Sequence, residues 1–248
     1  SNGREAVNMV QLAGGLALTQ GRHQIKIEDI EWVINSGNYN RRPEKSVSST
    51  PQIGCINGLA VYGPNLGTVM DIEAVAIPSL KRKGILTITG MIDEEEIGSD
   101  MKRLKRKSTA RSSVDNVVTV MKKYLDIDTR DYDIHLNFPG GIPIDGPSAG
   151  VGIITAIYSA IENIPIDNTL AMTGEVSIRG DIKPVGGVPI KIEAARLAGA
   201  KRVIIPRDNW QAGFKNDYMD IIPVNRIEEV IAQAVYAGNG DKPVKTNG

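Results

Sequence analysis

Histidine and cysteine are both scarce in this chain. Its 248 residues include two histidines, His23 and His135, and one cysteine, Cys55. A single cysteine cannot form a disulfide within the chain, nor can it supply a cysteine-rich zinc site. Two histidines leave little material for a histidine-rich metal centre, so we expect no metal site. A Ser-His-Asp triad would have to use one of those two histidines.

The chain also lacks an excess of charge and a long apolar run. The 29 basic residues balance 29 acidic ones, so we expect no specific nucleic-acid partner. The longest apolar stretch, 151–161, falls well short of the roughly 18 residues that a membrane-spanning helix needs. The polar start, which includes Glu5, is unlike a signal peptide. We therefore expect a cytoplasmic protein without a membrane segment, or a soluble piece of a longer one.

Hydrophobic patterning divides the chain into a short helical start and a larger body. Aromatic residues make up only 4% of the sequence, but its 41% apolar content is enough to bury a sizeable core. The start shows helical periodicity, and a segment rich in proline and serine follows it. We expect a helical unit over 1–37, a linker over 38–52, the main domain over 53–238 and a flexible tail over 239–248.

The main domain mixes strands and helices without strict alternation, which predicts the α+β class. Within the helical start, the second helix is expected to have its N-terminal cap at Glu28 and Asp29.

The stretch 93–107 is acidic at first and then basic, and we interpret it as a solvated connection. A loop that handles substrate or partner is the alternative. Expected strands span 53–61, 67–77, 84–90, 132–138, 170–173, 176–178 and 201–205; expected helices span 112–125, 148–162, 189–198 and 224–236.

The segment 143–150, PIDGPSAG, carries the most chemical information. Its Ser148 stands where an apolar helix begins, and a serine in that position usually only caps the helix. The alternative is a nucleophile whose oxyanion is stabilised by free amides at the helix start. In that case Ala149 and Gly150 would leave space for a substrate carbonyl to approach.

A serine nucleophile needs a base, and the sequence offers two. His135 lies on the strand that precedes Ser148. Lys191 is flanked by Ile190 and Ile192, and burial among apolar neighbours would lower its pKa toward neutrality. Lysines more often point to solvent, and spacing alone does not bring Lys191 to Ser148. From the residues themselves, a Ser-Lys and a Ser-His centre both stay open.

Several separated motifs resemble the proteolytic domain of Lon proteases, and the wording PGGIPIDGPSAG is closest to the B-type branch. In chain order they are the segment 143–150, the MTGE segment 172–175, and paired glycines followed by Lys191. The resemblance covers about residues 50–237. Further similar segments are Gly58-Leu59-Ala60, Arg179-Gly180, Ile204-Ile205-Pro206 and 226–230.

The resemblance implies a serine endopeptidase with a Ser-Lys dyad, the proteolytic part of an ATP-dependent Lon protease that degrades unfolded or regulatory proteins. Ser148 matches the nucleophile of the family and Lys191 its base. Thr173 matches a threonine that helps to position the lysine. Asp145 matches an acidic residue with a regulatory or structural role. The alternative is a non-catalytic Lon-like scaffold or substrate-binding module, which often lacks the dyad.

Residues 2–8 resemble the start of the last helix of an AAA+ ATPase lid. Arg4 would match the arginine that senses nucleotide there, and an ordinary surface arginine is the alternative. The chain has no G-x-x-x-x-G-K-[ST] segment and so no P-loop. We therefore expect no cofactor in this chain, with ATP and Mg needed only by an ATPase region outside it. The resemblance further implies polypeptide substrates and a homo-hexameric ring in the full-length protein.

Overall fold

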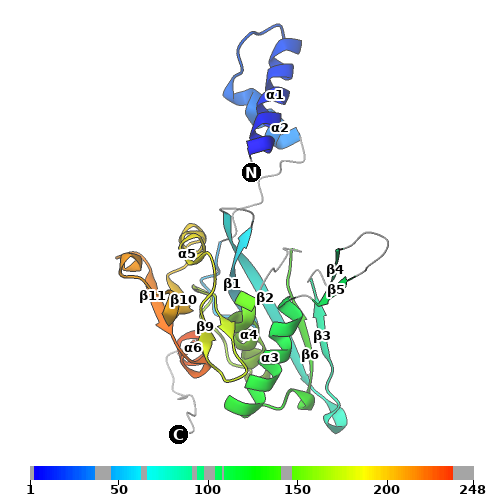
Figure 1. The fold of residues 1–248 in the computed structure, drawn as a ribbon, viewed down its shortest axis with the longest axis vertical. Coiled ribbons are helices and arrows are strands. Elements are labelled where there is room, and N and C mark those ends of the chain that lie inside the picture. Colours follow the sequence, from blue (N-terminus) through cyan, green and yellow to red (C-terminus); the bar gives the residue numbers. More distant parts are fainter. Residues whose placement is uncertain are drawn as a thin grey trace. The chain divides into compact units, whose positions relative to one another are not determined.

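The chain divides into two compact units, residues 1–44 and 45–248, and each is described by itself. A computed structural model shows their helices and strands (Figure 1). The predicted identity of the first unit as part of an ATPase lid, and the predicted limits of linker and tail, stay predictions. The structure describes residues 3–36, 46–62, 66–90, 94–97, 104–107, 109–140 and 147–236.

The first unit contains helix α1 (Gly3–Thr19) and helix α2 (Ile27–Ser36). The Arg22 guanidinium, in the connection between them, donates two hydrogen bonds to the Asp29 carboxylate, at 2.5 and 2.8 Å. Asp29 also accepts the Lys26 amide at 2.8 Å. The predicted cap at Glu28 and Asp29 is therefore wrong. The helix begins at Ile27, and Asp29 reaches back from its first turn to a preceding amide.

The second unit is built on a seven-stranded mixed sheet, which confirms the predicted class. Its order is β11-β10-β7-β1-β2-β6-β3. The pairs β1–β2 and β2–β6 are antiparallel, and every other neighbouring pair is parallel. The strands are β1 (Cys55–Tyr62), β2 (Leu66–Pro78), β3 (Leu86–Thr89), β6 (Tyr132–Asn137), β7 (Leu170–Met172), β10 (Arg202–Pro206) and β11 (Asp220–Val224).

Helices cover both faces of the sheet around β7. Its Leu170 and Met172 belong to one apolar cluster, together with residues of α3 (Thr109–Tyr124), α4 (Gly150–Glu162) and α6 (Ile227–Ala234). Ala171 belongs to a second cluster, together with residues of α5 (Val188–Leu197). Because successive side chains of a strand point to opposite faces, α4 and α5 lie on opposite sides of the sheet.

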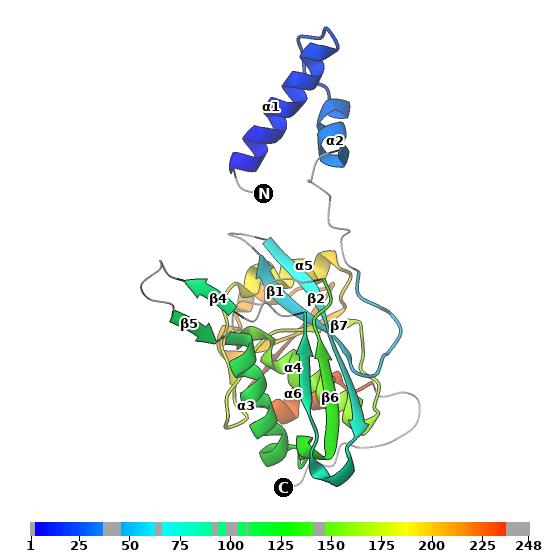
Figure 2. The same cartoon turned by 90° about the vertical axis from the view of Figure 1, so that its right-hand side faces the viewer.

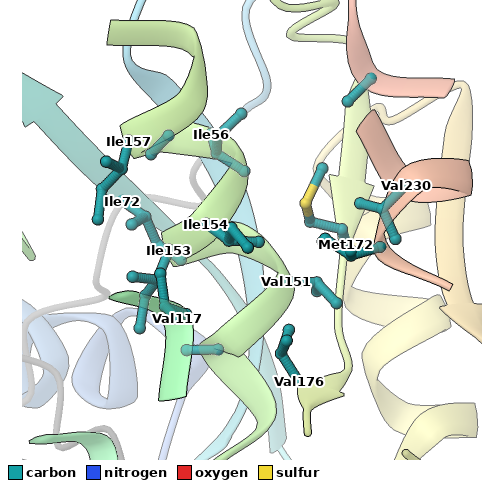
Figure 3. Packing of buried hydrophobic residues seen from close by; sticks show 14 of the residues in the cluster. Ile56, Ile72, Val117, Val151, Ile153, Ile154, Ile157, Met172, Val176 and Val230 are labelled. Carbon is teal, nitrogen blue, oxygen red and sulfur yellow. The ribbon is translucent and has the colours of Figure 1, made fainter. Parts of the chain in front are cut away.

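Helix α4 forms the centre of the larger cluster, and Figure 3 shows side chains from several elements packed around it. Its Val151, Ile153, Ile154 and Ile157 are fully buried. Figure 2 shows α3 and α6 beside α4. A helix buried on most of its surface needs apolar residues almost all round, which explains the unbroken run that begins at Val151.

Three strand pairings lie outside what local patterning predicts. Strands β4 (Glu94–Ile97) and β5 (Leu104–Lys107) form an antiparallel pair, so the predicted connection over 93–107 is in part a two-stranded sheet. Its backbone register pairs Glu94 with Lys107 and Ile97 with Leu104. Strands β8 (Glu175–Val176) and β9 (Ile182–Lys183) form another pair. Strand β11 was not predicted, and the final helix is shorter than expected, because 220–224 extends along β10.

Candidate active site

Ser148 lies in a single 3-10 turn (Pro147–Ala149) that directly precedes α4. Its carbonyl accepts the Gly174 amide at 2.9 Å, and the Val151 amide donates to the Gly174 carbonyl at 3.2 Å. These two bonds tie the turn to the segment that follows β7. The regular helix thus begins two residues after Ser148. The Val151 amide is already bonded, so it is not one of the free helix-start amides that the sequence led us to expect.

Gly150 is a point of close packing. A Cβ built there would lie 3.0 Å from the Val176 amide nitrogen, and one at Gly174 would lie 2.9 Å from a methyl carbon of Ile182. Both glycines are buried. The space at Gly150, which we assigned to a substrate carbonyl, is therefore taken by strand β8. Absence of a side chain lets the start of α4 approach that strand.

Thr173 follows the last residue of β7 and is fully buried. Its amide donates to the Ile204 carbonyl of β10 at 3.1 Å, which continues the pairing of the two strands. Its hydroxyl donates to the Ser148 carbonyl at 3.3 Å and accepts from the Lys191 amine at 3.0 Å. One threonine thus contacts both residues of the predicted dyad.

Lys191 lies in the first turn of α5, and only 3% of it is exposed. Its backbone amide donates to the Gly187 carbonyl at 3.0 Å. Burial lowers the pKa of Lys191 from the ordinary 10.5 to about 8, and no charged residue in the described part of the chain contributes to that shift. Burial disfavours the charged form of an amine, so this lysine releases its proton far more readily than a lysine in water.

The loop before α5 is held by a residue that sequence reasoning missed. Asn209 accepts the Val185 amide at 2.7 Å and donates to the Val185 carbonyl at 3.0 Å. Asn209 stands after β10, far from Val185 in sequence, and its surroundings carry no local pattern that marks it. Only the folded arrangement shows its contact with this loop.

The other predicted residues are not brought to this cluster. His135 lies on β6, exposed, with its Nε2 3.0 Å from the Thr89 hydroxyl. Its neighbours Ile134 and Leu136 face the cluster that contains α4, so His135 faces the opposite side of the sheet. Asp145 and the side chain of Arg4 lie outside the described residues, and Arg4 falls within α1. Ala149 is buried beside Ser148.

The described ranges contain neither a metal-binding cluster nor a membrane-spanning helix. No group of three or more histidine, cysteine or acidic residues there is arranged to hold a metal ion. No helix in those ranges is long and apolar enough to cross a bilayer.

Comparison with known proteins decides the family. Residues 24–237 match the family described as the Lon protease (S16) C-terminal proteolytic domain. The chain belongs to this family. As a Lon-family chain it falls among serine proteases, and in the described structure Thr173 contacts both the Ser148 carbonyl and the buried Lys191 amine.

Two relatives illustrate the similarity to Lon proteases. The chain is 54% identical over 231 residues to Lon protease 2 of Bacillus subtilis (strain 168), an alignment that covers 93% of this chain and 42% of that protein. It is 36% identical over 253 residues to the archaeal Lon protease of Archaeoglobus fulgidus, covering 95% of this chain and 38% of the relative. The chain thus spans less than half the length of these Lon proteases.

Proposed function

We propose that this chain hydrolyses peptide bonds with Ser148 as nucleophile and Lys191 as general base. The observation that carries the proposal is the buried Lys191 amine, which donates to Thr173 while the Thr173 hydroxyl donates to the Ser148 carbonyl. With a pKa of about 8, roughly one Lys191 amine in ten is neutral at pH 7, against fewer than roughly one in a thousand at the ordinary value. A neutral amine can accept the serine proton.

The reaction has two halves. The Ser148 oxygen attacks the scissile carbonyl while its proton passes to the neutral Lys191 amine. The tetrahedral intermediate collapses, the C–N bond breaks, and the Lys191 ammonium gives its proton to the leaving amine. Water then attacks the acyl-enzyme ester, transferring a proton to Lys191, and release of the Ser148 oxygen with that proton restores the starting state.

Two single substitutions test this function. We expect Ser148→Ala and Lys191→Met each to lower hydrolysis of a fluorogenic peptide and of unfolded casein by about a thousandfold or more. His135→Ala is the control and should keep wild-type activity, because His135 lies on β6, separated from β7 by β1 and β2, where its Nε2 contacts the Thr89 hydroxyl. Wild-type activity in either dyad variant would overturn the proposal. If the wild-type chain binds unfolded polypeptide but never cleaves it, and Ser148→Ala binds equally well, the chain is a substrate-binding module.

We further propose that the full-length protein works as an ATP-dependent homo-hexameric ring that degrades unfolded or regulatory proteins. The support is membership of the Lon family, together with the greater length of the relatives, of which the chain spans 42% in the Bacillus subtilis protein. ATP and Mg would act on an ATPase region outside this chain, because the sequence has no P-loop of its own.

A further inference from the structure

Asn209 ends a short 3-10 turn (Arg207–Asn209) that directly follows strand β10. Its side-chain oxygen accepts the Val185 amide at 2.7 Å, and its side-chain nitrogen donates to the Val185 carbonyl at 3.0 Å. One planar side chain therefore bonds both backbone polar groups of Val185. Two parallel hydrogen bonds fix orientation as well as distance, so Val185 has little freedom to shift relative to β10.

The segment that Asn209 holds leads directly into the helix of Lys191. Gly187 takes the left-handed backbone conformation (φ 67°), and a Cβ there would lie 2.6 Å from a methyl carbon of Val61 in β1. The Lys191 amide in turn bonds the Gly187 carbonyl. The loop that runs from Val185 to α5 therefore passes close to β1. Its position sets how deeply the first turn of α5 lies.

Strand β10 also holds the partner of the lysine. Ile204, within β10, accepts the Thr173 amide at 3.1 Å. The donor and the acceptor of the 3.0 Å bond between Lys191 and Thr173 are therefore both held in place by β10 or the turn that follows it. Thr173 is tied to it directly, and Lys191 is tied to it through Asn209 and the loop that begins at Val185.

We propose that Asn209 is a positioning residue for Lys191: by clamping Val185 it holds the start of α5 at the depth where the lysine amine reaches Thr173. Asn209 itself does not touch the reacting groups. The effect on catalysis rests on the proposed function, whereas the effect on Lys191 does not. The two are therefore separable by experiment.

The titration of Lys191 tests the positioning directly. We compare Ser148→Ala with Ser148→Ala/Asn209→Ala by NMR of lysines labelled with carbon-13 at Cε, and assign the signal by its loss in Lys191→Met. In the parent we expect a midpoint near 8, a value caused by burial alone among the described residues. With Asn209 removed, the amine should become more hydrated and the midpoint should rise by about one pH unit or more. An unchanged midpoint would overturn the proposal.

Asn216 provides the matched control. Its side chain accepts the Met219 and Tyr218 amides, at 2.8 and 3.1 Å, and donates to the Phe214 carbonyl at 2.9 Å. Asn216→Ala thus removes a comparable set of bonds from the same β10–β11 connection without touching Val185. It should leave the Lys191 midpoint in place. An equal shift in Asn216→Ala would mean general loosening and would overturn the specific role.

A second substitution guards against misfolding. Asn209→Leu has nearly the same shape and adds no charge, but it loses both the acceptor for the Val185 amide and the donor to the Val185 carbonyl. We expect it to fold and to shift the Lys191 midpoint in the same direction as Asn209→Ala. Circular dichroism and thermal unfolding confirm folding for each variant. A folded Asn209→Leu protein with the parental midpoint would contradict the clamp.

The pH profile of peptide hydrolysis then separates positioning from the proposed function. In Asn209→Ala we expect kcat to fall by about tenfold near neutral pH, with KM little changed, and to recover in part at alkaline pH. A uniform loss at every pH would overturn the positioning role. If Lys191→Met cleaves like wild type, the proposed function fails, while the NMR titration still decides what Asn209 does. If both dyad variants are inactive but Asn209→Ala behaves like wild type, only the positioning role falls.

Discussion

A lysine amine as deeply buried as that of Lys191 affects stability as well as chemistry. Its pKa is about 8 in the folded chain and 10.5 ordinarily, so between these values the unfolded chain binds more protons. The free energy of unfolding therefore rises with pH across that window. Below it, the amine binds its proton in both states, and the folded state carries the whole cost of burying a charged amine. Above it, the cost is gone.

We therefore expect Lys191→Met to stabilise the chain near neutral pH. The free energy of unfolding should increase by up to about 3 kcal/mol, because each pKa unit corresponds to about 1.4 kcal/mol. The gain should shrink as pH rises from about 8 and vanish above 10.5. Urea denaturation at a series of pH values measures it.

Lys123→Met, at an exposed position of α3, serves as the control for this experiment. It should show no comparable change between neutral and alkaline pH. If Lys191→Met were instead less stable than wild type by the same amount at every pH, burial would not be lowering the pKa of Lys191 in the folded chain.

At the level of single residues, the sequence indicated part of the site. Ser148, Thr173 and Lys191 lie in recognisable sequence motifs, and the structure brings them into one cluster. The residues alone left Lys191 and His135 both open, because spacing along the chain does not tell which side chain folds back to Ser148. The resemblance to Lon proteases favoured Lys191. The contact of Asn209 with Val185 could not be predicted, because a hydrogen bond to a backbone segment distant in sequence produces no local sequence pattern.

At the level of elements, the start of α4 packs closely against strand β8. A methyl group at Gly150 would lie 3.0 Å from the Val176 amide nitrogen, and backbone atoms cannot turn aside as a side chain can. We expect Gly150→Ala to lower the free energy of unfolding by about 1–3 kcal/mol. Peptide hydrolysis should fall as well, because the turn that holds Ser148 must move.

Gly213→Ala is the control for the junction, because a Cβ there would meet nothing within 4 Å. It should change neither urea unfolding nor peptide hydrolysis appreciably. A Gly150→Ala protein as stable and as active as wild type would show that α4 and β8 can separate at no cost.

Elements with a strong local pattern were predictable. The alternation over 132–138 and the apolar run from Val151 gave β6 and α4. Strand β11 escaped because it contains Pro223, and proline argues against a strand except at an edge. In the described sheet, β11 lies at such an edge. The pair β4–β5 was not predicted because a run of charged residues suggests a solvated connection, and its pairing depends on a register that local patterning does not contain.

At the level of the whole molecule, the proposed ring leads to a prediction about association. Exposed apolar side chains gather on the outer side of β2 and beside β3, with Val75 and Ile77 each 60% exposed and Ile85 66%. Sedimentation velocity at rising concentration should show a species of six copies, or a monomer that reaches six copies as concentration increases. A species that stays monomeric at every concentration would mean that ring contacts come from outside this chain.

The two helical layers on opposite sides of the sheet also bear on when activity can arise. The turn that holds Ser148 leads into α4 on one side, Lys191 comes from α5 on the other, and they meet at Thr173, at the end of β7. A chain with only one layer docked has one half of the proposed dyad in place and the other unplaced. The two residues of the proposed dyad are therefore brought together only when both helical layers are docked on the sheet. If Ser148 and Lys191 act as proposed, a partly folded copy could not cut its neighbours, and proteolysis would begin only when both layers are docked.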